Sequence, residues 1–138
     1  MSSLVLDSHA LLVYFEKEPG WEQVTHHLTA SANDDSTLLL SVVNWGEIDY
    51  VTRRVYGPDA AAEVRRIIED LPLEIRDADR SHTQAAARLK ARGGLSYADC
   101  FAAGLADQTD GAVLTGDPEF ERIEDRVDVR WLDADASR

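Results

Sequence analysis

The sequence predicts one three-layer α/β/α domain, in which a mostly parallel sheet of four to five strands lies between helices. Two observations lead to this fold class. Short apolar runs alternate along the chain with longer segments of helical periodicity, and runs such as "TLLLS" and "AVLT" are continuously apolar. Continuously apolar strands indicate burial on both faces, and intervening helices long enough to serve as crossovers favour parallel pairing.

The N-terminal half is expected to contain two strands and four helices. "SLVL" at 3–6 is short, apolar and followed by Asp7-Ser8, and "TLLLS" at 37–41 follows the turn cluster "NDDS", so both predict buried strands. Helical spacing of apolar residues predicts helices over 9–17 and 21–30, separated by Pro19-Gly20, and over 43–56 and 59–71, separated by Gly57-Pro58.

The C-terminal half continues the alternation. Apolar runs predict strands at 73–76, 112–115 and 127–132, and helical segments are expected over 79–92, ending at Gly93-Gly94, and over 96–106. Asp117-Pro118 predicts the start of a short helix. The domain is expected to occupy residues 1–132, and residues 133–138 are expected to form a frayed tail.

The composition limits the classes of function. No apolar run approaches the roughly 20 residues that a membrane helix requires, and the N-terminus has no signal-peptide pattern. One cysteine, Cys100, cannot form an internal disulfide, so a cytoplasmic location is expected. The net charge of −12 indicates either adaptation to high salt or an ordinary acidic protein, and it argues against a generally basic nucleic-acid-binding surface.

Four acidic residues are expected near one edge of the sheet. Asp7 follows the first predicted strand, Glu47 lies one turn into the helix after the second, and Asp117 follows the fourth. Asp99 lies in the first turn of the helix that leads into the fourth strand, and that helix begins at the same edge. Ligand sites of open parallel sheets lie beyond the carboxyl ends of the strands.

Each of these acids also has a purely structural interpretation. Asp7 and Asp117 are suited to capping the helices that follow them, Ser96 and Asp99 have the spacing of a capping box, and Glu47 could be solvated. Their convergence would nevertheless be unfavourable without a cation, because carboxylates brought together repel one another. Carboxylates without a zinc-like set of His and Cys favour Mg²⁺ or Mn²⁺.

The stretches "LVLDSHALL", "SVVNWGEIDYVTRR", "LSYADCFAAGLA" and "VLTGDPEF" together resemble the four acidic motifs of PIN-domain proteins. The similarity is best to the compact toxin ribonucleases of the VapC type. The motifs occur in the family's order and extend from Val5 to Phe120.

This resemblance implies a PIN fold with the acids in a groove, and Mg²⁺- or Mn²⁺-dependent cleavage of RNA. It makes Asp7, Glu47, Asp99 and Asp117 the expected catalytic residues, with the three aspartates as metal ligands and Glu47 acting directly or through a bound water. It also implies a homodimer and a cognate VapB-type antitoxin. The expected chemistry is in-line hydrolysis by a metal-activated water, which leaves a 5′-phosphate and a 3′-hydroxyl.

Several further residues are assigned supporting roles. Ser8 and Thr115 flank the acids and could orient water or a carboxylate, although Ser8 could equally be a helix-start residue. Asn44 is interpreted first as a cap of its own helix and second as part of the groove lining. The basic residues proposed to hold flanking RNA, with solvated helix faces as the alternative, are Arg53, Arg54, Arg88, Lys90 and Arg92.

Three alternative classes of protein rank below the nuclease. A PIN-fold RNA-binding or regulatory protein without catalytic activity ranks second to the nuclease. A receiver-type domain is disfavoured because only Asp7 ends the first strand and no lysine follows Lys90. A haloacid-dehalogenase-type phosphatase would need a second aspartate two residues after Asp7, where the chain has His9.

Overall fold

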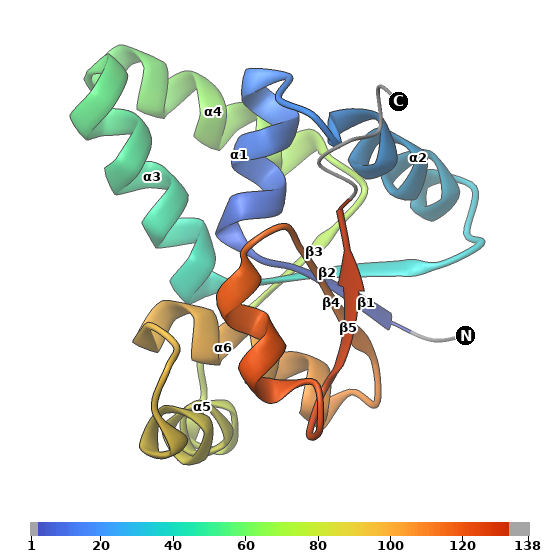
Figure 1. Ribbon diagram of the computed structural model, residues 1–138. Coiled ribbons are helices and arrows are strands. Elements are labelled where there is room, and N and C mark those ends of the chain that lie inside the picture. The colour runs from blue at the N-terminus through green and yellow to red at the C-terminus, as the bar shows by residue number, and fades with distance from the viewer. Residues whose placement is uncertain (1–2, 133–138) are drawn as a thin grey trace.

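The computed structural model describes residues 3–132 and has a five-stranded sheet at its centre (Figure 1). The strands are β1 (Ser3–Leu6), β2 (Thr37–Ser41), β3 (Glu74–Arg76), β4 (Ala112–Thr115) and β5 (Asp128–Trp131). Their order is β3-β2-β1-β4-β5, and every neighbouring pair is parallel. The chain therefore moves outward from β1 to β3 and then returns to the other side of β1, which makes the junction of β1 and β4 the topological switch point.

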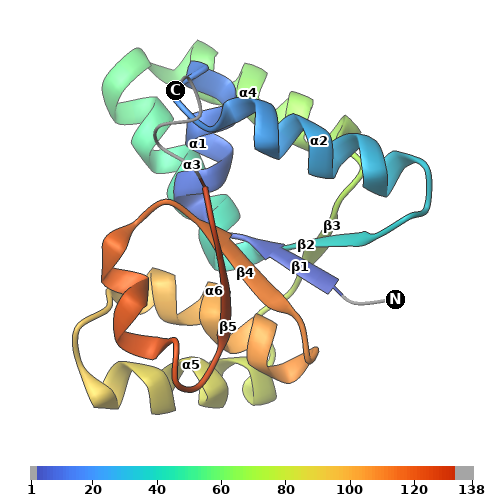
Figure 2. The ribbon, with the colours of Figure 1, turned by 45° about the vertical axis from the view of Figure 1, so that its right-hand side comes forward.

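Helices cover both faces of the sheet. They are α1 (Ser8–Glu16), α2 (Trp21–Ala32), α3 (Val42–Tyr56), α4 (Pro58–Asp70), α5 (Arg80–Arg92), α6 (Tyr97–Gln108) and the 3₁₀ helix η1 (Pro118–Ile123). Helices α1 to α4 lie on one side of the sheet, and α5, α6 and η1 lie on the other (Figures 1 and 2). The predicted three-layer α/β/α architecture is confirmed.

The core is divided in two by the sheet, and successive strand residues point into opposite halves. In β1, Val5 packs with side chains of α5 and α6, whereas Leu4 and Leu6 pack with side chains of α1 to α3. Leu39 and Leu40 of β2 alternate in the same way. Burial on both faces explains why these strands are continuously apolar, since each fully buried leucine stabilises the fold by roughly 1.5–3 kcal/mol.

Several predicted element ends differ from the structure by one or two residues, mostly because of capping. The helix expected from Asp79 begins at Arg80, since Asp79 is the N-cap and its carboxylate accepts a hydrogen bond from the His82 amide. Ser96 caps α6 in the same way. The two edge strands, β3 and β5, are shorter than the predicted 73–76 and 127–132.

Two further expectations concern the C-terminal tail and membrane-spanning helices. The tail predicted at residues 133–138 lies outside the described residues. Within residues 3–132, no helix is both long enough and apolar enough to cross a membrane.

Candidate functional site

Asp7 lies at the carboxyl end of β1, at the topological switch point, and is completely buried. Its Oδ1 accepts a hydrogen bond from the Ala10 amide at 2.8 Å and so caps α1, and its Oδ2 accepts one from the Thr115 hydroxyl at 2.5 Å. Burial raises the pKa of Asp7 to about 7, against the lowering effect of these hydrogen bonds. The negative charges of Asp99 and Asp117 contribute to this raised pKa, as expected of neighbouring carboxylates.

Thr115, the last residue of β4, connects Asp7 to Asp117. While its hydroxyl donates to Asp7, the same oxygen accepts a hydrogen bond from the Asp117 amide at 3.0 Å. Asp117 in turn caps η1, because its Oδ1 accepts a hydrogen bond from the Glu119 amide at 3.0 Å. The helix-capping interpretation of Asp117 is therefore correct, and it leaves lone pairs on both carboxylate oxygens for other ligands.

Asp99 comes to the same place from the other face of the sheet, in the first turn of α6. Its amide donates to the Ser96 hydroxyl at 3.1 Å, as the predicted capping box requires. Burial raises the pKa of Asp99 to about 6, and the charges of Asp117, Glu47 and Glu119 raise it as well, while a hydrogen bond with Ser96 lowers it. Charge repulsion of this kind is relieved when a cation binds.

The carboxylates of Asp99, Asp117 and Glu119 form the closest acidic group, with one oxygen of each within 4.8 Å of the others. Glu119 was not predicted from the sequence; the available signal was an acid two residues after Asp117 at the start of a short helix. Three carboxylate oxygens are hard ligands of the kind that Mg²⁺ and Mn²⁺ prefer, so the residues present fit such a cation.

Glu47 is partly buried in α3, and hydrogen bonds connect it through Ser8 and Asn44 to the backbone carbonyl of Ala98, next to Asp99. The hydroxyl of Ser8, at the start of α1, donates to Glu47 Oε1. Asn44, one turn earlier in α3, donates from Nδ2 to Ser8 Oγ at 3.2 Å and to the Ala98 carbonyl at 3.1 Å. The preferred interpretation of Asn44 as a helix cap is wrong, because α3 begins at Val42 and is capped by the hydroxyl of Ser41.

The basic residues predicted to contact RNA divide between two helices. On α3, Arg53 pairs with Asp49 at 3.4 Å and Arg54 lies over the Tyr50 ring. On α5, Lys90 donates to the Leu95 carbonyl at 2.9 Å and Arg92 pairs with Asp125 at 2.8 Å. Arg88, which is exposed on α5, makes no ion pair within residues 3–132. RNA contact by these side chains stays a prediction.

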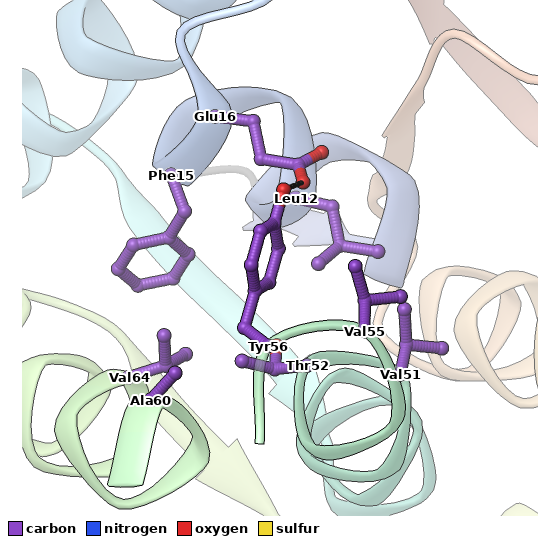
Figure 3. Close-up of a pocket in the computed structure, with 9 residues that line it drawn as sticks. All are labelled: Leu12, Phe15, Glu16, Val51, Thr52, Val55, Tyr56, Ala60 and Val64. Atoms are coloured by element: carbon purple, nitrogen blue, oxygen red, sulfur yellow. Dashed lines mark hydrogen bonds between the residues drawn. The ribbon is translucent and has the colours of Figure 1, made fainter.

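A groove of about 400 Å³ lies between α1, α3 and α4, and it contains none of the predicted catalytic acids (Figure 3). Apolar side chains line most of it: Leu12, Phe15, Val51, Val55, Ala60 and Val64. At its rim the Tyr56 hydroxyl donates to Glu16 at 2.8 Å. An apolar lining of this kind suits side chains of a protein segment rather than a phosphate group.

Comparison with known proteins agrees with this fold. The sequence matches the PIN domain over residues 4–126, and the chain therefore belongs to the PIN domain family. No curated protein gives a significant match to the sequence.

Several solved structures share the fold at low sequence identity. A chain of the DNA-bound VapBC2 from Rickettsia felis superposes with a TM-score of 0.75 at 16% identity, covering 95% of this chain and 99% of that one. A chain of DNA-bound VapBC from Salmonella typhimurium has a TM-score of 0.74 at 20% identity, with 96% and 100% covered. VapC20 of Mycobacterium tuberculosis, described as a toxin that cleaves the sarcin-ricin loop, has a TM-score of 0.70 at 14% identity, with 92% and 98% covered.

Proposed function

We propose that this PIN-domain protein is a divalent-metal-dependent endoribonuclease and the toxin of a type II toxin–antitoxin pair. The observation that carries the proposal is the convergence of Asp99, Asp117 and Glu119 at the sheet edge next to the switch point. The charges of Asp99 and Asp117, which act on buried Asp7, add support. A sheet edge with only a structural role gains no stability from mutually repelling acids.

Each acid is assigned a role from its position. Asp99, Asp117 and Glu119 would hold the cation, with Asp7 as a further ligand. Hydrogen bonds from the Ala10 amide and the Thr115 hydroxyl orient the Asp7 carboxylate. Bound Mg²⁺ or Mn²⁺ would supply positive charge at the phosphoryl oxygens and lower the pKa of a water molecule. Glu47, whose carboxylate accepts a hydrogen bond from Ser8, would orient that water or accept its proton.

The substrate is proposed to be RNA despite the net charge of −12. Neutralisation of the scissile phosphate is local, and arginine side chains stack on unpaired bases as well as pairing with phosphates. Arg88 supports this proposal best, since its guanidinium has no ion pair within the described part of the chain. Arg53, Arg54, Lys90 and Arg92 would first have to exchange the partners described above.

The partner is proposed to be a VapB-type antitoxin, because the similar solved structures include VapBC complexes. The apolar groove between α1, α3 and α4 is a suitable surface for an antitoxin segment, and two of its lining residues, Val55 and Tyr56, are exposed. We further propose, as for the VapC-type proteins that the sequence resembles, a homodimer that acts in the cytoplasm.

The proposed activity is tested with purified protein, structured RNA and Mn²⁺. Wild type should cleave the RNA to 5′-phosphate products, and Asp7→Asn and Asp99→Asn should reduce the rate by about 100-fold or more, since charge stabilisation of several kcal/mol is lost. Glu119→Gln should weaken Mn²⁺ binding by at least about tenfold. Glu121→Gln, on the same 3₁₀ helix but outside the acidic group, is the matched control.

Two results would contradict the proposal in different ways. Equal cleavage by wild type and both aspartate variants would show that the nuclease is a contaminant. Binding of RNA by wild type without any Mn²⁺-dependent cleavage would favour the alternative of a PIN-fold binding protein that lacks catalytic activity.

A further inference from the structure

Asn44 is a buried polar residue that connects three of the elements on which the acids lie. Its side chain has no exposed surface, although it belongs to the first turn of a helix. From α3, its Nδ2 donates to Ser8 Oγ on α1 and to the carbonyl of Ala98 on α6. Asp7 caps α1, Glu47 lies on α3, and Asp99 directly follows Ala98. One amide therefore holds together the segments that carry three acids.

The hydrogen bond from Asn44 to Ser8 also determines where the Ser8 proton points. A hydroxyl has one proton, and an oxygen that accepts from an amide must direct that proton toward a different acceptor. Ser8 is buried, and its strongest acceptor is Glu47 Oε1. The other acceptor, the backbone carbonyl oxygen of Asn44, lies farther from Ser8 Oγ, at 3.4 Å. The result is a directed chain from Asn44 through Ser8 to the Glu47 carboxylate.

Packing alone does not explain an asparagine at this position. Its Oδ1 is buried and has no hydrogen-bond partner within the described residues 3–132. A buried acceptor without a partner is destabilising, and a leucine, which has the same number of side-chain heavy atoms and the same branching at Cγ, would have no such acceptor. The residue is therefore better explained by what its Nδ2 donates to than by its contribution to the core.

We propose that Asn44 is a positioning residue for the acidic site: it fixes Glu47 through Ser8 and fixes Asp99 through the Ala98 carbonyl. This inference rests on the proposed nuclease function, because it assigns Asn44 a role in the same site. Hydrogen-bond partners of this kind, one step removed from the ligands, set the orientation of carboxylates at metal sites.

The test replaces Asn44 by leucine, which keeps the number of side-chain heavy atoms and the branching at Cγ and removes both hydrogen bonds. Asn44→Leu should lower kcat for RNA cleavage by about 10- to 100-fold and weaken Mn²⁺ binding, followed by electron paramagnetic resonance without RNA, by about tenfold. KM should change little, because Asn44 is buried and cannot contact RNA. Ser8→Ala should lower kcat in the same way, and the double variant should be no worse than the more affected single variant by more than about twofold.

The matched control is His82→Leu. His82 is buried on α5 and its Nε2 donates to another α6 carbonyl, that of Phe101, at 2.9 Å. This variant also removes a buried hydrogen bond to α6, whereas kcat and Mn²⁺ affinity of the folded protein should stay near wild type.

The possible results distinguish failure of the positioning role of Asn44 from failure of the proposed nuclease function. If wild type cleaves RNA and Asn44→Leu retains the kcat and Mn²⁺ affinity of His82→Leu, the positioning role is wrong. If Asn44→Leu does not fold, Ser8→Ala alone decides: wild-type kcat and Mn²⁺ affinity in that variant would overturn the chain to Glu47. If wild type does not cleave RNA at all, the proposed function fails first.

Discussion

Asp7 remains costly to ionise even though both of its oxygens accept hydrogen bonds. Complete burial raises its pKa to about 7, from an ordinary value of 3.8, and the neighbouring carboxylates add to the rise. Because the pKa is higher in the folded than in the unfolded protein, the folded state binds the proton more tightly. Stability from this group is fully present below about pH 4 and is lost as the pH rises toward 7.

Asp7→Asn should therefore flatten the pH dependence of stability in the metal-free protein. Each pKa unit corresponds to about 1.4 kcal/mol, so the buried carboxylate destabilises the wild type by as much as a few kcal/mol at pH 8. An asparagine can still cap α1 through its carbonyl oxygen. We expect a higher free energy of unfolding for Asp7→Asn at pH 8 and a smaller gain at pH 5, measured by urea denaturation with a chelator present.

The control for this prediction is Asp79→Asn, which changes an exposed N-cap carboxylate on α5. It should leave the pH slope of stability as in wild type. Part of the slope should also persist in Asp7→Asn, because burial raises the pKa of Asp99 to about 6. A wild-type slope in Asp7→Asn would contradict the assignment of a desolvated carboxylate at this position.

Single residues of the candidate site differ in how far the sequence could locate them. Asp7, Asp99 and Asp117 were found because they end strands or begin helices, and these are local features. Glu119 joins Asp99 and Asp117 only because η1 turns as a 3₁₀ helix, which short-range patterns do not specify. The bridging role of Asn44 depends on long-range packing of three helices, and the local pattern suggested a helix cap instead.

At the scale of elements, the packing of α5 against α6 depends on a glycine. A Cβ on Gly104 of α6 would lie 3.0 Å from the Ala86 amide nitrogen and 3.3 Å from Ala85 Cβ, both on α5. Backbone atoms of α5 cannot move aside without shifting the whole helix. Asp99 lies on the same helix, in the first turn of α6.

Gly104→Val should therefore destabilise the protein by about 1–3 kcal/mol, because extra atoms in a packed helix contact force the backbone apart. Gly46→Ala is the opposite case, since a Cβ at this helical position in α3 meets no atom within 4 Å. That variant should stabilise by about 0.5–1 kcal/mol through helix propensity alone. Urea midpoints measure both, and a Gly104→Val protein as stable as wild type would show that α5 and α6 are not tightly packed.

Elements as a whole were predictable where their signal was local. Strands at 3–6, 37–41 and 112–115 agree with the structure, because continuous apolar runs bounded by turn residues identify buried strands. Their order in the sheet was not predicted, since the placement of β4 beside β1 depends on a crossover that passes through α5 and α6. The apolar groove was likewise absent from the predictions, because it forms between α1, α3 and α4.

The whole molecule has many more acidic than basic residues, 26 against 14. The ion pairs within residues 3–132 engage few of these acids: Asp49, Glu63, Glu74, Asp107 and Asp125. The other exposed carboxylates repel one another in the folded protein more than in the expanded unfolded chain. Self-repulsion over such distances is sensitive to ionic strength.

Raising KCl from about 0.1 to about 1 M should therefore stabilise the metal-free protein, since the screening length falls from about 10 to about 3 Å. A gain of 1 kcal/mol corresponds to about 4 °C in a chain of this size, so melting by circular dichroism should shift upward by several degrees. Glu69→Gln with Asp70→Asn removes two exposed acids without ion pairs in the described structure, and should reduce the salt dependence. A melting temperature that falls with KCl would contradict self-repulsion and, with it, the idea of adaptation to high salt.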